Sequence, residues 1–251
     1  MSKLSTDQHN IEIQKNLIRW NKKPTLQKIY LEFYKTIASN LNREIQGKIV
    51  ELGSGISNMK IIIPEVICTD IFQNSRIDQI ENAYHLSFEN ESVSNLILFD
   101  VWHHLQYPGS ALSEFNRILK PNGRVIIFEP AMSISGFIIY GLFHHEPIGY
   151  FKEIKWESFN PDNREKDEYY AALGNASRVF CSKRFNHLLT EWNVIRIQKK
   201  SAISYILSGG YSKPQLYPGK FLPILKLIEI FLDIFPGLFA TRLLVALEKK
   251  S

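Results

Sequence analysis

The spacing of apolar residues divides the chain into a helical start and a longer region in which short apolar runs alternate with helical stretches. Between residues 8 and 41, apolar side chains recur every three or four positions, which predicts helices interrupted at Lys23-Pro24. Four later runs read as strands: KIVEL (48–52), EVICTD (65–70), SNLILFD (94–100) and GRVIIFEP (123–130). Between the last two, PGSALSEFNRIL has the proline start and single apolar face of a helix. This alternation predicts an α/β fold with a parallel sheet.

The alternation stops after Pro130 and returns in WNVIRIQKK (192–200) and ATRLLVALEKK (240–250). We therefore expect an N-terminal helical addition over residues 1–46 and one α/β domain over residues 47–251. Within that domain, residues 131–190 should form a long insertion after the fifth strand, and a second insertion should precede the last strand.

The first strand ends in an acid and is followed by two glycines, in the run KIVELGSGISNMK (48–60). Gly53 and Gly55 let the backbone turn tightly and approach a ligand without a Cβ in the way. The segment from Ser57 should present free N–H groups at a helix N-terminus. A dinucleotide fingerprint would need a third glycine at Asn58, and Glu51 would repel a pyrophosphate at the turn. The turn therefore suits a zwitterionic or cationic ligand.

Asp70 ends the second predicted strand, nineteen residues after Glu51. A carboxylate at that strand end can accept hydrogen bonds from both hydroxyls of an unphosphorylated ribose. Alone, Asp70 would be better explained as a strand-end turn residue. Its distance from the glycine turn favours the ribose role.

Four motifs, in this order, resemble the class I S-adenosylmethionine-dependent methyltransferases, in their small-molecule branch. They are VELGSG (50–55), TD (69–70), the segment from Glu81 to Leu105, and SEFNRILKPNGRVIIFEP (113–130). The resemblance covers about residues 47–130. It implies a Rossmann-like sheet of seven strands in the order 3-2-1-4-5-7-6, with the last strand antiparallel. It also implies S-adenosyl-L-methionine as the cofactor.

Carried over to this sequence, the resemblance gives a set of cofactor-binding residues. Glu51, Gly53 and Gly55 would surround the methionine moiety and the ribose, and Asp70 would bind the ribose hydroxyls. Further along, Asn82-Ala83 stands where the family often has Asp-Ala beside the adenine, and Phe99 and Asp100 would line the methionine end. An amide oxygen at Asn82 can still accept the hydrogen bond of the adenine amino group.

Two histidine pairs could supply a base for methyl transfer to a hydroxyl. VWHHL places His103 and His104 just past the fourth strand, and LFHHEP places His144 and His145 in the insertion, beside Glu146. For the first pair, a structural hydrogen bond that tethers the loop is a better explanation than catalysis. For the second pair, an exposed loop position without a function and a catalytic role are equally good explanations. Within the pairs we favour His104 and His145. Their spacing does not demand a metal, so none is expected.

The stretch FLPILKLIEIFLDIFPGLF (221–239) is apolar except for one narrow stripe of Lys226, Glu229 and Asp233 at helical spacing. So broad an apolar face predicts a helix buried against its own domain. The alternatives are an apolar substrate channel or a membrane-surface face for a lipid-linked acceptor.

Composition adds few constraints. The formal charge is +5 over 251 residues, and the two cysteines, Cys68 and Cys181, are expected to be reduced thiols. The polar N-terminus does not read as a signal peptide, and no run of 18 apolar residues occurs, so a cytoplasmic location is expected. A nucleic acid substrate is disfavoured because FDVWHH replaces the Asn/Asp-Pro-Pro-aromatic run of base-methylating enzymes.

Together these features predict a methyltransferase that acts on a small or lipid- or glycan-linked acceptor, with O-methylation favoured because bases are at hand. The insertion over residues 131–190 would then cover the acceptor site, and a peripheral contact with a membrane stays open. The alternative is a catalytically silent module of the same fold that binds the cofactor or a partner. The oligomeric state cannot be read from the sequence.

Overall fold

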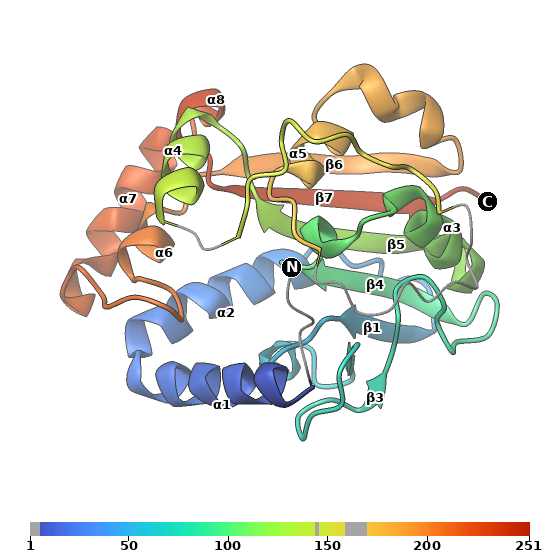
Figure 1. Ribbon diagram of the computed structural model, residues 1–251, viewed down its shortest axis with the longest axis horizontal. Coiled ribbons are helices and arrows are strands. Elements are labelled where there is room, and N and C mark those ends of the chain that lie inside the picture. Colours follow the sequence, from blue (N-terminus) through green and yellow to red (C-terminus); the bar gives the residue numbers. More distant parts are fainter. Residues whose placement is uncertain (1–5, 144–145, 159–169) are drawn as a thin grey trace.

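The computed structural model describes residues 6–143, 146–158 and 170–251. At its centre is a sheet of seven strands in the order β3-β2-β1-β4-β5-β7-β6 (Figure 1). The strands are β1 (Lys48–Leu52), β2 (Ile67–Asp70), β3 (Gln79–Ile80), β4 (Val93–Phe99), β5 (Leu119–Pro130), β6 (Trp192–Lys200) and β7 (Arg242–Lys249). Neighbours from β3 to β5 are parallel, whereas β7 is antiparallel to both β5 and β6. The predicted fold class, strand order and direction of the last strand are confirmed.

One face of the sheet is covered by helices from both ends of the chain, α1 (Thr6–Lys22), α2 (Pro24–Ala38) and α6 (Ile203–Leu207). The helices α1 and α2 are separated at Lys23, as the Lys23-Pro24 pair predicts, because proline starts a helix readily but cannot continue one. Apolar residues of α2 pack on Ile97 and Ile126, which point to this face from the central strands.

The opposite face is covered by α3 (Pro108–Ile118), α5 (Asn175–Phe180) and the 3-10 helix η3 (Lys183–Leu188). These elements pack on the alternate residues of the same strands, such as Leu96 and Val125. Since β4 and β5 are buried on both faces, they read as continuous apolar runs in the sequence.

The connection from β1 to β2 differs from the prediction. Ser57 adopts a left-handed backbone conformation (φ +57°), and only the single-turn 3-10 helix η1 (Asn58–Ile61) follows it. The side chain of Ser57 does not cap that turn. A helix therefore does begin here, with Ser57 as its N-cap, but it is a single 3-10 turn and not a regular α-helix.

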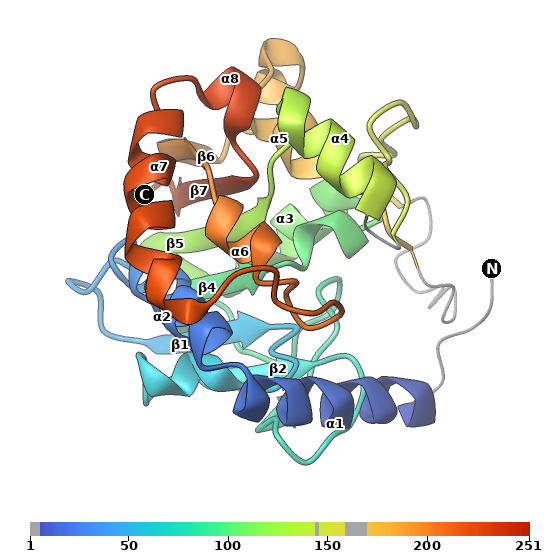
Figure 2. The ribbon, with the colours of Figure 1, turned by 90° about the vertical axis from the view of Figure 1, so that its left-hand side faces the viewer.

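The two insertions contain most of the remaining helices. The helix α4 (Ile134–Phe143) follows β5, and η4 (Gly219–Phe221), α7 (Leu222–Leu232) and α8 (Pro236–Phe239) lie between β6 and β7. In both views α4, α7 and α8 lie together at one end of the molecule (Figures 1 and 2), and α4 contacts α8.

The orientation of α7 is opposite to the prediction. Only Leu222 and Glu229 of this helix are buried, whereas Leu227, Ile230 and Phe231 are each more than 60% exposed, at 67%, 67% and 63%. The polar stripe faces the domain and the broad apolar face points to solvent. Among the described residues, no helix combines the length and the apolar character needed to span a bilayer.

Candidate active site

The glycine turn follows β1 at the carboxyl edge of the sheet. Gly53 (φ +65°) and Gly55 (φ +52°) are left-handed, and a Cβ at Gly53 would lie 2.5 Å from Cγ2 of Val101. Ser54 fastens the turn to β2, because its N–H donates to the carbonyl of Thr69 (2.8 Å) and its Oγ accepts from the N–H of Thr69 (3.0 Å). The backbone of the turn is therefore held rigidly against the end of the second strand.

Glu51 is buried beneath this turn, with 4% of its surface exposed. Burial raises the pKa of its carboxyl group to about 7, and the neighbouring charge of Asp70 adds to the increase. A cationic ligand above the turn would favour the ionised form of Glu51, which agrees with the prediction that the turn binds a zwitterionic or cationic ligand.

Asp70 lies directly beside the turn and is under-satisfied as a hydrogen-bond acceptor. Its Oδ2 is 3.4 Å from the backbone nitrogen of Gly55 and 3.5 Å from Nε2 of His9, and its Oδ1 is 3.4 Å from the nitrogen of Phe72. All three contacts are longer than good hydrogen bonds, yet the residue is only 5% exposed. A buried carboxylate with such contacts has capacity for hydroxyl donors.

Asn82 and Ala83 follow β3 at the same sheet edge, both half-buried. The amide oxygen of Asn82 accepts a hydrogen bond from the backbone N–H of Tyr84 (3.0 Å). One lone pair of that oxygen remains for a further donor.

Phe99 ends β4, and Asp100 follows it directly. Asp100 is left-handed (φ +55°), and its carboxylate pairs with Arg242, whose side chain is 2% exposed. The guanidinium of Arg242 lies 4.5 Å from the ring centroid of Tyr205 and 5.8 Å from that of Phe99. Arg242 thus holds the Asp100 carboxylate at the sheet edge.

The first histidine pair lies in the 3-10 helix η2 (Trp102–His104), and its side chains meet Glu146 of the insertion. Nε2 of His103 is 3.2 Å from Oε2 of Glu146, and Nε2 of His104 is 3.5 Å from Oε1. On their other sides, Nδ1 of His103 is 2.7 Å from Oε2 of Glu129, and Nδ1 of His104 is 2.9 Å from the carbonyl oxygen of Tyr170. We call His103, His104 and Glu146 the histidine–glutamate cluster.

The two imidazoles differ in charge. Burial alone would lower the pKa of His103, but Glu129 and Glu146 outweigh it and raise that pKa to about 10. For His104, burial and the adjacent charge of His103 lower the pKa. The pKa of His104 is therefore well below that of His103. His145 lies outside the described residues.

Comparison with known proteins supports the interpretation that the sheet edge suggests. Residues 53–127 match the model of a family described as a methyltransferase domain. This segment, which contains the glycine turn and Asp70, is similar to the methyltransferase domain of class I S-adenosylmethionine-dependent enzymes. No curated protein sequence matches this chain.

Solved structures show the same fold for this methyltransferase. A Thermotoga maritima protein, described as a possible histamine N-methyltransferase, is 14% identical with a TM-score of 0.54, and the match covers 94% of each chain. A Haloferax volcanii methyltransferase, solved in complex with the Trm112 methyltransferase activator, is 11% identical with a TM-score of 0.51. That match covers 86% of this chain and 88% of the other.

The residues of the turn fit the cofactor that this class of enzyme uses. S-adenosylmethionine carries a ribose diol, an ammonium group and a sulfonium group. Because the contacts of Asp70 are long, its oxygens can accept hydrogen bonds from the ribose diol. The carboxyl group of Glu51 lies beneath the turn, where its ionised form would attract the positively charged groups of the cofactor. Around Gly55, the one atom of the described residues that a Cβ would meet within 4 Å is Cδ1 of Ile13, at 3.9 Å, so this part of the structure leaves space for a ligand.

Several residues of this methyltransferase site were not anticipated from the sequence. His9 reaches Asp70 from α1, Arg242 reaches Asp100 from β7, and Glu129 reaches His103 from β5. Arg242 and Glu129 did carry a signal, since each is a charged residue inside a run of apolar strand residues. Glu146, which the sequence places beside His145, faces the first histidine pair.

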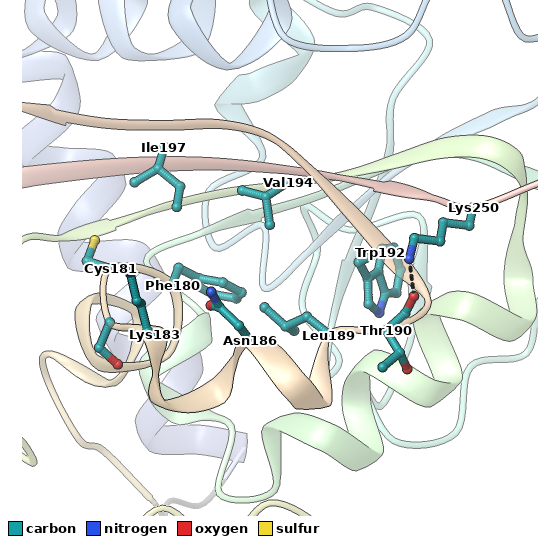
Figure 3. A pocket seen from close by; sticks show the side chains of 11 residues that line it. Phe180, Cys181, Lys183, Asn186, Leu189, Thr190, Trp192, Val194, Ile197 and Lys250 are labelled. Carbon is teal, nitrogen blue, oxygen red and sulfur yellow. Dashed lines mark hydrogen bonds between the residues drawn. The ribbon is translucent and has the colours of Figure 1, made fainter.

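An open hollow of about 570 Å³ lies elsewhere, between η3 and the outer strand β6 (Figure 3). Phe180, Cys181 and Asn186 line one side, and Val194 and Ile197 of β6 line the other. None of the predicted site residues lines this hollow, and we assign it no role in methyl transfer.

Proposed function

We propose that this enzyme transfers the methyl group of S-adenosylmethionine to a hydroxyl group of a small or lipid- or glycan-linked acceptor at a membrane surface. The observation that carries the proposal is the outward apolar face of α7. The cofactor would be held by the eight residues named from the family resemblance: Glu51, Gly53, Gly55, Asp70, Asn82, Ala83, Phe99 and Asp100.

The inward face of α7 explains why the helix is oriented in this way. Nζ of Lys226 is 2.6 Å from Oε2 of Glu32 on α2 and 3.0 Å from Oε2 of Glu229. Oε1 of Glu229 also accepts hydrogen bonds from the backbone N–H and the hydroxyl of Ser204, at 2.7 and 2.6 Å. Asp233, just past the helix, accepts from the N–H of Ser201 (2.6 Å). These polar contacts fix the stripe against the domain and leave the apolar side without a partner among the described residues.

The exposed apolar surface extends over three helices, and we call it the apolar end face. Its residues are Ile134, Ile138 and Leu142 of α4, Ile224, Leu227, Ile228, Ile230 and Phe231 of α7, and Ile234, Phe235 and Leu238 in and before α8, all between 41% and 72% exposed. A typical monomer exposes apolar patches of roughly 300–600 Å² at most. Here eleven large apolar side chains, each at least 41% exposed, lie on neighbouring elements. An apolar surface of this size usually contacts a membrane or another molecule.

A lipid surface suits the apolar end face better than water because the face has no outward charge. The helices α4 and α8 contain no charged residue, and the two charged residues of α7, Lys226 and Glu229, both face the domain. Helices that lie in the membrane interface bury such an apolar side into the headgroup region. A lipid-linked acceptor would then reach the enzyme without leaving the bilayer.

The chemistry of O-methylation requires alignment and removal of one proton. The acceptor oxygen attacks the methyl carbon, the carbon–sulfur bond breaks with its electron pair going to sulfur, and the hydroxyl proton must leave. Alignment of the reacting atoms can contribute on the order of 7–11 kcal/mol, and base assistance roughly 10²–10⁴-fold.

We propose that the histidine–glutamate cluster, at the same sheet edge, accepts the hydroxyl proton of the acceptor. In the metal-free chain, Nδ1–H of His104 donates to the carbonyl of Tyr170, so the lone pair of Nε2 faces the cluster and can accept the proton. The sequence also suggested His145, which we keep as a second candidate base. The insertion over residues 131–190 supplies Glu146 and so would border the acceptor.

A vesicle-binding assay tests the membrane part of the proposal. The double variant Leu227→Ser/Phe231→Ser should lose most binding to phospholipid vesicles and most turnover of a lipid-borne acceptor. Ile11→Ser, on α1 and 53% exposed, is the matched control and should bind vesicles as the wild type does. S-adenosylhomocysteine affinity should be unchanged in both variants. Vesicle binding that persists in the double variant would contradict the proposal.

A further inference from the structure

We propose that the histidine–glutamate cluster is a site for one divalent cation of the zinc class, with His103, His104 and Glu146 as protein ligands. The ligand atoms of these three residues all lie within 4.8 Å of one another. Two imidazole nitrogens and one carboxylate form a donor set found in catalytic zinc sites, which keep a fourth position open.

The ligand atoms lie close enough together to surround one ion, and the widest pair, separated by up to 4.8 Å, would draw closer when the ion binds. Bonds to Zn²⁺ are about 2.0–2.1 Å long, so the ligand atoms of a tetrahedral site lie roughly 3.3 Å apart. The two nitrogen–oxygen distances to Glu146 are 3.2 and 3.5 Å. The two distances reach different oxygens of Glu146 and are also those of ion pairs, so the spacing is compatible with an ion and the outer contacts of the histidines carry the rest of the argument.

The outer contacts of the two histidines also fit metal ligands. In protein metal sites, a ligating histidine donates its other ring N–H to a carboxylate or to a backbone carbonyl. Nδ1 of His103 lies 2.7 Å from Glu129, and Nδ1 of His104 lies 2.9 Å from the carbonyl of Tyr170. Both contacts fix Nδ1–H as the donor. Binding of the ion would displace the Nε2 proton of His103 to solvent, and the Nε2 lone pairs of both rings would then bind the ion.

Glu129 is itself held in place, which gives the site a rigid outer shell. It is 1% exposed, and its Oε1 accepts a hydrogen bond from the backbone N–H of Trp102 (2.8 Å). The competing arrangement is a protonated His103 between Glu129 and Glu146, with no ion. It accounts for His103, whereas an ion accounts for the approach of both Nε2 atoms to the same carboxylate.

The bound ion would hold the acceptor, and this part of the inference rests on the proposed function. An acceptor hydroxyl in the open position would lose its proton to solvent more readily because the ion stabilises the alkoxide. With the ion bound, Nε2 of His104 is a ligand and no longer the proton acceptor. The remaining atoms follow the displacement described above, in which the oxygen takes the methyl group and sulfur takes the electron pair.

Equilibrium dialysis against Zn²⁺, without S-adenosylmethionine or acceptor, tests the site. The wild type should bind one ion per chain more tightly than His104→Ala and Glu146→Gln, each of which should lose at least tenfold in affinity. Glu129→Gln should lose about 10–100-fold, as outer-shell changes do. His187→Ala, an exposed histidine of η3, is the control and should match the wild type.

Retained affinity for S-adenosylhomocysteine would show that each variant is folded. Co²⁺ in place of Zn²⁺ gives a second readout on the wild type alone, because four-coordinate Co²⁺ absorbs visible light far more strongly than the hexa-aqua ion. Wild-type binding no tighter than that of His104→Ala, or a Co²⁺ spectrum like that of the aqua ion, would overturn the site. Zinc binding without methylation of any hydroxyl would instead contradict the proposed function.

Discussion

Nε2 of His9, in the first turn of α1, lies 3.5 Å from Oδ2 of Asp70, the carboxylate at the end of β2. A helix from the start of the chain therefore reaches the group that we expect to bind the ribose. Ile13 of the same helix lies beside Gly55. The N-terminal addition thus covers the cofactor turn, and cofactor binding and the docking of α1 should be coupled.

The His9–Asp70 contact should make stability depend on pH above neutrality. The interaction of its ring N–H with the carboxylate of Asp70 raises the pKa of His9 above its usual 6.5, against the effect of burial. A raised pKa contributes stability that is complete below pH 6.5 and is lost as the pH rises through the folded-state value. Denaturant unfolding between pH 6 and pH 8.5 should show this loss, of up to about 1 kcal/mol, in the wild type. His9→Gln should lack this contribution, and an identical slope in the variant would contradict the contact.

Glu51 should destabilise the free protein at neutral pH. Burial raises its pKa from 4.5 to about 7, so the folded state holds a proton that the unfolded state releases. The free energy of unfolding should therefore fall by up to about 3 kcal/mol as the pH rises from 4.5 to 7, which is about 1.4 kcal/mol for each pH unit. Glu51→Gln should remove this fall and unfold at higher denaturant than the wild type at pH 8.

The same Glu51→Gln variant should bind the cofactor more weakly. The neutral amide no longer favours the cationic ligand, and calorimetry with S-adenosylmethionine at pH 8 measures the loss. If the variant and the wild type have equal stability and equal cofactor affinity at pH 8, Glu51 neither destabilises the free protein nor contributes to cofactor binding.

The orientation of α7 gives opposite expectations for two adjacent residues. Lys226→Ala should cost about 2–3 kcal/mol of unfolding free energy because it leaves Glu229 buried without its cation. Leu227→Ala should stay within about 0.5 kcal/mol, because that side chain is 67% exposed and packs little. Urea unfolding of the two variants decides between this orientation and the reverse, for which the larger cost would fall on Leu227.

The strands were predictable because their patterns are local. Continuous apolar runs identify β4 and β5, and a carboxylate such as Asp70 at a strand end must lie at the carboxyl edge of a parallel sheet. The family resemblance added the strand order and the antiparallel β7.

What the sequence could not supply depends on contacts between distant segments. Helical spacing divides α7 into two faces, but it does not say which face is inward, and the decision comes from Glu32 and Ser204 in other helices. In the same way, the meeting of His104 with Glu146 depends on the path of the insertion. The left-handed backbone at Ser57 has no side-chain signal at all.

The central claim is that a hydroxyl of a membrane-held acceptor receives the methyl group of S-adenosylmethionine bound beside Asp70. The most direct measurement uses cofactor with a deuterated methyl group, membranes from the cell that makes the enzyme, and mass spectrometry of the lipid extract. We expect a lipid-linked species that gains one deuterated methyl group on oxygen with the wild type. The same species should be reduced at least tenfold with Asp70→Ala at limiting cofactor, because hydrogen bonds to a charged acceptor contribute about 1.5–3 kcal/mol each. Label found only in water-soluble compounds or on nitrogen, or equal labelling by wild type and Asp70→Ala, would contradict the claim.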